Sequence, residues 1–188
     1  MRLLRELNDS VVLGQTGTNP ADFPTPSAPP PRLTARAIVK NQNGLFAVMY
    51  SDKFGLHSLP GGGIEDGEDA ITALRRELLE ETGCTCSEIQ ELGIVSEYRA
   101  CQNYAQESYY YVVSVSQEAR SLHLTPSELE SNTVVQWHTF ASMLHLISSP
   151  NHTTEQRKYI QARDMAALDA YQKLHASFTP AFRQQDGH

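Results

Sequence analysis

The chain has 188 residues, of which 40% are hydrophobic and 20% charged, and its formal net charge at neutral pH is -7. This is ordinary globular composition, and the length suffices for one core-forming domain with extensions. A net negative charge without a long basic stripe argues against a general nucleic-acid binder, because such proteins neutralise a phosphate backbone with Lys and Arg.

The cysteines and the hydrophobic runs of the sequence indicate the cellular compartment in which the protein is expected. The three cysteines, Cys84, Cys86 and Cys101, form no paired Cys-x-x-Cys units, so neither a disulfide framework nor a structural zinc site is predicted. The N-terminus lacks the unbroken apolar core of a signal peptide, and no apolar run approaches the length of a membrane helix. We therefore expect a reduced, cytoplasmic protein without membrane contact.

Residues 1–32 are expected to form an N-terminal extension that ends in a proline-rich linker. Six of the ten prolines lie between Pro20 and Pro31, which excludes a helix or a central strand there. Apolar side chains within residues 1–15 could pair with the domain or with another subunit. A homodimer is therefore possible, and the role of this segment stays open.

The central domain is expected to span residues 33–176 and to begin with a β-hairpin. Two strand-like runs, 33–40 and 45–50, flank Asn43-Gly44, a pair that tolerates positive φ and gives the strongest short hairpin signal. A further short strand is predicted within residues 55–59.

A glycine-rich turn, residues 59–63, then leads into a predicted helix. The helix should start near Asp69 and stop at Gly83, because glycine suits the left-handed position just past a helix end. An apolar stripe with helical spacing would hold this helix on a core. The stripe consists of Ile71, Leu74 and Leu78.

Three carboxylates share one face of this predicted helix. Each helical residue advances by about 100°, which groups Glu77, Glu80 and Glu81. Like charges at these spacings destabilise a helix by roughly 0.2 to 0.5 kcal/mol per pair. A divalent cation with oxygen ligands would offset that cost. A solvated acidic face is the alternative, and for an isolated run of this kind it is the commoner one.

The spacing of these residues resembles the signature of the Nudix (MutT-like) hydrolases. That signature is Gly, five residues, Glu, seven residues, then Arg-Glu-apolar-any-Glu-Glu-any-Gly-apolar. With each residue type at roughly one in twenty, its seven fixed positions match by chance on the order of once in a billion starts. The resemblance implies an α/β fold, an α/β/α sandwich with a mixed β-sheet between helices. The matching residues are Gly62, Glu68, Arg76, Glu77, Leu78, Glu80, Glu81, Gly83 and Cys84.

The resemblance also implies a metal centre. Arg76 would bind no metal but would pair with Glu68 through charge-assisted hydrogen bonds, which holds turn and helix in register. The metal would be Mg²⁺, with Mn²⁺ as a possible substitute. Its implied ligands are Glu77, Glu80, Glu81 and the backbone carbonyl of Gly61.

In the family that this chain resembles, an acid outside the signature helix often completes the metal site. Glu107 is the first candidate, because it stands beside a tyrosine-rich strand. Its rivals are Glu118, Glu128 and Glu130. The base that activates water could be a signature glutamate or an acid such as Glu107, and the sequence leaves this choice open.

The rest of the chain supplies further strands and helices. Strands are predicted at 89–98, 108–115 and 134–138, with a polar loop at 102–106. Helices are predicted at 140–147 and 154–173, followed by a tail at 177–188. Within the second strand, Tyr109 and Tyr111 share one face and Tyr110 the other. The shared pair could line a nucleobase pocket, although packing is the commoner role of aromatic residues in a central strand.

The implied function is Mg²⁺-dependent hydrolysis of a pyrophosphate linkage in a nucleoside diphosphate linked to another moiety. The alternative is a non-catalytic nucleotide sensor on the same fold, because fold does not determine function. No proline lies between Pro60 and Pro126, which mildly disfavours ADP-ribose. Nucleoside triphosphates therefore stand slightly ahead of nucleotide sugars. The expected partner is a small nucleotide, and specificity should come from the loops near Lys53 and Gln102 and from the tyrosine strand.

Overall fold

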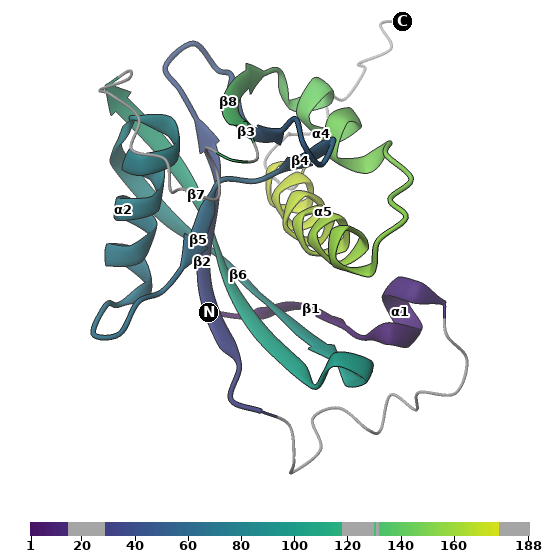
Figure 1. Cartoon of the computed structure of the whole chain (residues 1–188). Coiled ribbons are helices and arrows are strands. Elements are labelled where there is room, and N and C mark those ends of the chain that lie inside the picture. Colours follow the sequence, from purple (N-terminus) through teal and green to yellow (C-terminus); the bar gives the residue numbers. More distant parts are fainter. Residues whose placement is uncertain (15–28, 118–129, 131, 177–188) are drawn as a thin grey trace, which may run out of the picture.

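The computed structural model describes residues 1–14, 29–117, 130 and 132–176. A mixed β-sheet lies between helices (Figure 1). Helix α2 (Ala70–Thr82) covers one face, and α4 (Phe140–Ser148) and α5 (Glu155–Ala176) cover the other. This is the layered α/β arrangement that the sequence predicts.

The sheet contains both parallel and antiparallel pairs. Its order is β1-β6-β7-β2-β3-β4, with β5 paired to β2 and β8 paired to β3. The pairs β1–β6 and β2–β7 are parallel, and the others are antiparallel. The strands are β1 (Leu3–Leu7), β2 (Arg32–Lys40), β3 (Phe46–Ser51), β4 (Leu56–Ser58), β5 (Gly61–Gly63), β6 (Thr85–Arg99), β7 (Tyr104–Gln117) and β8 (Thr133–His138).

Strand β2 has two neighbours on one side. Its residues 34–36 pair with the three glycines of β5, whereas it meets β3 in register only at Lys40, opposite Phe46. The predicted hairpin around Gly44 is confirmed, and that glycine has a φ of 78°. The glycine-rich turn is therefore part of the sheet, bonded to strand β2, which also pairs with β7.

The predicted signature helix is confirmed with its caps. Asp69 precedes α2, and its carboxylate accepts the N–H of Thr72 at 2.7 Å, which satisfies an otherwise unpaired first-turn donor. Gly83 ends the helix in the left-handed conformation with a φ of 68°. The downstream helices and the strand near the tryptophan also lie where they are predicted.

The predicted polar loop at 102–106 is wrong. The chain reverses within a short 3₁₀ helix, Ala100–Gln102, and Asn103, which has a φ of 46°, so that β7 already begins at Tyr104. Polar side chains are accommodated in these strands because they bond to one another. The Tyr104 hydroxyl donates to Gln106 at 2.6 Å, and the Arg99 guanidinium lies 4.9 Å from the centre of the Tyr104 ring.

The N-terminal segment packs on the domain in its described part. Strand β1 pairs with β6 at the edge of the sheet, and Leu7 is 1% exposed. Helix α1 (Asp9–Leu13) follows, and Asp9 accepts the hydroxyl of Tyr159 at 2.6 Å and the N–H of Cys101 at 3.3 Å. Most of the predicted proline-rich linker and the tail at 177–188 lie outside the described residues.

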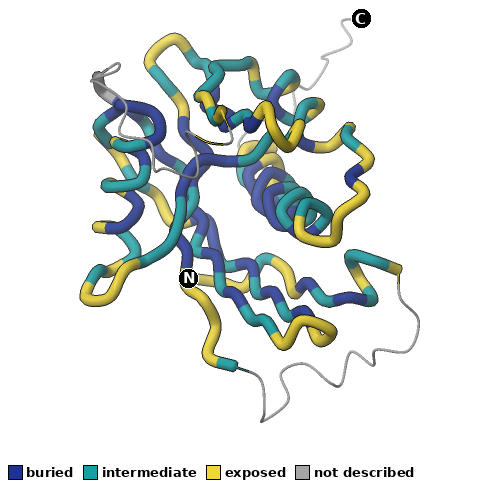
Figure 2. The backbone as a smooth tube through the Cα atoms, in the orientation of Figure 1, coloured by how far each residue is buried: buried dark blue, intermediate teal, exposed yellow. Residues whose placement is uncertain are grey.

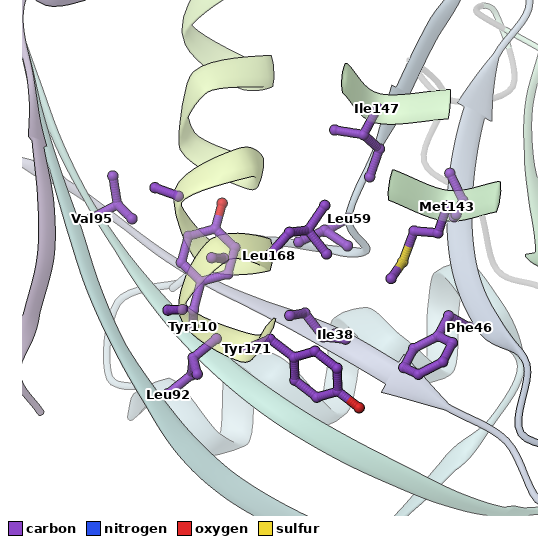
Figure 3. Close-up of a cluster of buried hydrophobic side chains, with 14 of the residues drawn as sticks. Ile38, Phe46, Leu59, Leu92, Val95, Tyr110, Met143, Ile147, Leu168 and Tyr171 are labelled. Carbon is purple, nitrogen blue, oxygen red and sulfur yellow. The ribbon is translucent and has the colours of Figure 1, made fainter. Parts of the chain in front are cut away.

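Two hydrophobic clusters hold the layers together. On the α2 face, Leu74 and Leu78 pack against alternate residues of β2, whereas Ile38 of the same strand points to the α5 face. The α5 side is the larger cluster, part of which is drawn in Figure 3. The strands between the helices are correspondingly buried (Figure 2).

Within the described ranges, none of the helices combines the length and the apolar character needed to cross a bilayer.

Candidate active site

The signature glutamates lie on the side of α2 that faces the glycine turn. The apolar stripe fixes this orientation, because Leu74 and Leu78 are fully buried. Glu81, in the last turn of the helix, is 7% exposed, and its Oε2 accepts the N–H of Gly61 at 2.6 Å. A carboxylate on α2 is thus bonded directly to the backbone of β5.

At two positions of the turn, Gly61 and Gly62, neighbouring atoms lie too close to the backbone to leave room for a Cβ atom. Gly61 has a φ of 122°, and a Cβ built there would lie 2.2 Å from the carbonyl oxygen of Ala35. A Cβ on Gly62 would lie 2.4 Å from the carboxyl carbon of Glu77. Real Cβ atoms do not approach other atoms so closely, so glycine lets β5 pack against β2 on one side and Glu77 on the other.

Arg76 joins the turn to the helix through several hydrogen bonds. Its Nε and Nη2 donate to the two oxygens of Glu68, both at 2.9 Å, in the bidentate geometry of a strong ion pair. Nη2 also donates to the carbonyl of Gly63 at 2.9 Å. Nη1 reaches Glu77 at 2.9 Å and Glu80 at 3.4 Å. The expected pairing of Arg76 with Glu68 is present, and the same guanidinium holds two signature glutamates.

The electrostatics of this ion pair keep both partners charged. The hydrogen bonds from Arg76 lower the pKa of Glu68, and the backbone N–H of Glu65 lowers it further. In return, the bonds to Glu68, and then to Glu77, raise the pKa of Arg76 above its usual value. The pair of Glu68 and Arg76 therefore places one negative and one positive charge beside the turn.

The donors of the cluster suit a hard divalent cation in kind. Carboxylate oxygens and a backbone carbonyl are the ligands that Mg²⁺ prefers, and the missing Cβ of Gly62 leaves Glu77 directly beside the turn. Among the described residues, no three acidic, imidazole or thiol groups already converge as a chelating cluster. Arg76 and the Gly61 N–H engage oxygens of Glu77, Glu80 and Glu81 instead.

Glu107 lies on β7, opposite Leu33 of β2 and Ser96 of β6. Its carboxylate accepts a hydrogen bond from the hydroxyl of Tyr109 at 3.2 Å. Burial raises the pKa of this tyrosine, and the contact with Glu107 raises it further. Within the part of the chain that the structure describes, no hydrogen bond or ion pair joins Glu107 to the turn or to α2. Its catalytic role stays a prediction.

Of the three rival acids, only Glu130 lies within the described residues. Its carboxylate accepts a hydrogen bond from the ammonium group of Lys53 at 2.7 Å, and both side chains are exposed to solvent. The two other rivals, Glu118 and Glu128, lie outside the described residues.

The tyrosine strand alternates as predicted. Tyr111 is buried against α2 and Tyr109 packs beside that cluster, whereas Tyr110 is fully buried on the α5 face. Burial raises the pKa of Tyr111 to about 12. For Tyr110 and Tyr111 the packing interpretation holds, because both are core residues.

One contact to the turn was not expected from the sequence. Asp164 of α5 accepts the N–H of Leu59 at 2.9 Å, and Arg36 of β2 donates to the carbonyl of the same leucine at 3.0 Å. The signal that could have revealed Asp164 is its helical spacing. It lies four residues after Ile160 and four before Leu168, so it shares one face of the predicted helix with two apolar residues.

The match to a known family decides how this cluster is to be understood. The family model of the NUDIX domain matches residues 30–162. The chain belongs to the Nudix family. The range includes the glycine turn, α2 and the first part of α5, so it contains the contacts of Arg76 and Glu81 described above, whereas Asp164 lies just beyond it.

Curated relatives match over short stretches. An RNA pyrophosphohydrolase from Dinoroseobacter shibae is 49% identical over 43 residues, which cover 23% of this chain and 27% of the relative. One from Shewanella denitrificans is 41% identical over 63 residues, 32% of this chain and 36% of the relative. Nudix hydrolase 25 from Arabidopsis thaliana is 42% identical over 52 residues, 28% of this chain and 30% of the relative. The match thus spans about a third of these relatives' length.

Solved structures confirm the fold class. A NUDIX hydrolase from Nitrosomonas europaea superimposes with a TM-score of 0.57 at 20% identity, over 79% of this chain and 90% of that one. The E. coli ORF135 protein gives a TM-score of 0.55 at 20% identity, over 80% and 94% of the respective chains. At such identities the similarity supports the fold alone.

Proposed function

We propose that this Nudix protein is a divalent-metal-dependent hydrolase that cleaves a pyrophosphate linkage in a nucleoside diphosphate linked to another moiety. The observation that carries the proposal is that the charged residues of the complete signature are hydrogen-bonded to one another and to the glycine turn. Glu81 binds the backbone of Gly61, and Arg76 links Glu68 to Glu77 and Glu80. A purely structural acidic helix face would leave this concentration of charge beside a glycine turn unexplained.

The proposed ligands of the metal are Glu77, Glu80, Glu81 and the carbonyl of Gly61. A Mg²⁺ ion bound there would supply Lewis-acid polarisation of a phosphoryl oxygen and a template for the attacking water. Mn²⁺ is expected to substitute, because it also takes oxygen ligands.

The chain's own residues would shape the rest of the reaction. The glycines of the turn let the backbone approach a phosphate without side-chain interference. Arg76 keeps Glu68 and Glu77 in place. A carboxylate must accept the proton of the attacking water, and we assign this role either to a signature glutamate or to Glu107.

Nucleoside triphosphates are the first proposed substrates. A second candidate is the triphosphorylated 5′ end of an RNA, because several relatives carry the name RNA pyrophosphohydrolase. The net charge of -7 favours the small nucleotide, since a long RNA would be repelled. We also propose a cytoplasmic location, and a homodimer as one possible assembly.

The proposal is tested by a substrate panel. Nucleoside triphosphates, nucleotide sugars, ADP-ribose, dinucleoside polyphosphates, coenzyme A and a short triphosphorylated RNA are incubated with Mg²⁺, Mn²⁺ or a chelator, and products are separated by chromatography. We expect metal-dependent release of product from at least one nucleotide. Glu80→Gln should abolish it, whereas Glu88→Gln, which changes an exposed glutamate of β6, should not.

The outcomes also distinguish a hydrolase from a non-catalytic nucleotide sensor. A nucleotide that binds without being cleaved under any metal condition would indicate a non-catalytic sensor. Cleavage of the RNA but of no free nucleotide would replace the preferred substrate class while keeping the reaction.

A further inference from the structure

Helix α5 is hydrogen-bonded to the chain segment that enters the glycine turn, and both lie on the same face of the sheet. Asp164 is fully buried, and both of its carboxylate oxygens are engaged. Oδ2 accepts the N–H of Leu59 at 2.9 Å, and Oδ1 accepts the hydroxyl of Tyr110 at 2.6 Å. Figure 3 shows Leu59 and Tyr110 beside α5, within the larger hydrophobic cluster.

Three successive residues are held by bonds from different elements. Asp164 holds the N–H of Leu59, and Arg36 of β2 donates to its carbonyl at 3.0 Å. The N–H of Ala37 donates to the carbonyl of Pro60 at 3.0 Å. The N–H of Gly61 then donates to Glu81 at 2.6 Å. The Gly61 carbonyl therefore follows directly after a backbone segment fixed from β2, α2 and α5.

A buried carboxylate is a costly way to satisfy one backbone N–H and one tyrosine hydroxyl. Burial penalises a charged group far more than a neutral one, unless strong hydrogen bonds compensate. Bonds to an ionised acceptor are also shorter and about twice as strong as neutral ones. Asp164 makes these bonds at a place where the position of the backbone matters for metal binding. The other buried residues of α5 are alanine, leucine and tyrosine, apart from Arg163, whose Nη1 donates to Glu97 at 3.4 Å.

We propose that Asp164 is a positioning residue of the active site, which fixes Leu59 and thereby sets the place of the Gly61 carbonyl and of Glu81. This inference rests on the proposed function, because it concerns the affinity of the proposed metal centre. Asp164 touches neither metal nor substrate in this account. It acts through the backbone of the turn.

The test compares three variants of the 188-residue chain by direct Mn²⁺ binding, followed as loss of the free-ion electron paramagnetic resonance signal. Asp164→Leu keeps the approximate shape but removes both acceptors. Asp164→Asn keeps an acceptor for Leu59, although a neutral one. Tyr159→Phe is the matched control, because it removes another buried hydrogen bond of α5, the one to Asp9, without touching the turn.

We expect Asp164→Leu to weaken Mn²⁺ binding by about tenfold, in line with the loss of a hydrogen bond to a charged acceptor. Asp164→Asn should lie between Asp164→Leu and the unmodified protein. The metal concentration for half-maximal turnover should rise in the same order. Tyr159→Phe should lower the melting temperature while leaving Mn²⁺ binding unchanged, which separates general destabilisation from positioning.

The result that overturns the inference is Mn²⁺ binding by Asp164→Leu that equals that of Tyr159→Phe. If Asp164→Leu does not fold, Asp164→Asn decides, together with hydrogen exchange of the Leu59 amide. Unchanged exchange and unchanged binding in that variant also overturn it. Failure of the unmodified protein to bind Mn²⁺ at all would instead count against the proposed metal centre.

Discussion

Replacing Gly62 by alanine tests whether the close approach of turn and helix serves the active site. The new Cβ would lie 2.4 Å from the carboxyl carbon of Glu77. Carbon atoms pack at about 3.5 to 4.0 Å, so the carboxyl group has to withdraw by about 1 Å. That shift would break its hydrogen bond with Arg76, which is 2.9 Å long now. The clash involves the end of a flexible side chain, so the fold itself should tolerate it.

The expected result is a loss of activity without a loss of structure. A misplacement of about 1 Å in an active site can cost on the order of a hundredfold in rate. Turnover is measured with the best substrate of the panel at saturating Mg²⁺, and the melting temperature by circular dichroism. Gly63→Ala is the matched comparison, because its Cβ would meet only the Arg32 guanidinium at 3.4 Å. Equal turnover in the two variants would refute the reasoning.

Two further predictions concern the stability of the site. Arg76 lowers the pKa of Glu68 in the folded state. The stability that this pair contributes is therefore fully present above the pKa of Glu68 in the unfolded chain, about 4.3, and is lost as the pH falls through the lower pKa of the folded protein. The melting temperatures of the unmodified protein and Glu68→Gln should therefore differ at neutral pH and converge in acid; a constant difference would contradict this. Leu74→Ala should destabilise the protein by about 2 to 5 kcal/mol in urea unfolding, because it leaves a cavity beneath α2. Leu79→Ala, at a residue of the same helix that is 36% exposed, should cost less than about 0.5 kcal/mol, and similar costs for both would contradict the packing of α2.

Local signals predicted the part of the fold around α2. Asp69 and Gly83 cap the helix by interactions within a few residues, and the apolar stripe has a clear helical period. The pairing of Arg76 with Glu68, which the resemblance to the Nudix signature implies, spans only eight residues. Such features can be inferred from a short stretch of sequence, because the partners that stabilise them are close by in the chain.

Contacts between distant segments could not be predicted in this way. The pairing of β1 with β6 joins residues near the N-terminus to residues beyond position 90, and nothing in the first ten residues specifies that partner. The first residues of β7 also have a distant partner, because Gln106 pairs with Arg32 of β2. Asp164 meets Leu59 across 105 positions of sequence. Its role depends on the packing of α5 against the sheet.

The most direct test of the central claim is turnover of Glu81→Gln at saturating Mg²⁺. Glutamine can still accept the N–H of Gly61, so the turn should remain in place, whereas the charge proposed to bind the metal is removed. We expect an unchanged melting temperature and a loss of turnover of more than about a hundredfold, on the scale of losing a transition-state interaction. Turnover equal to that of the unmodified protein would contradict the claim.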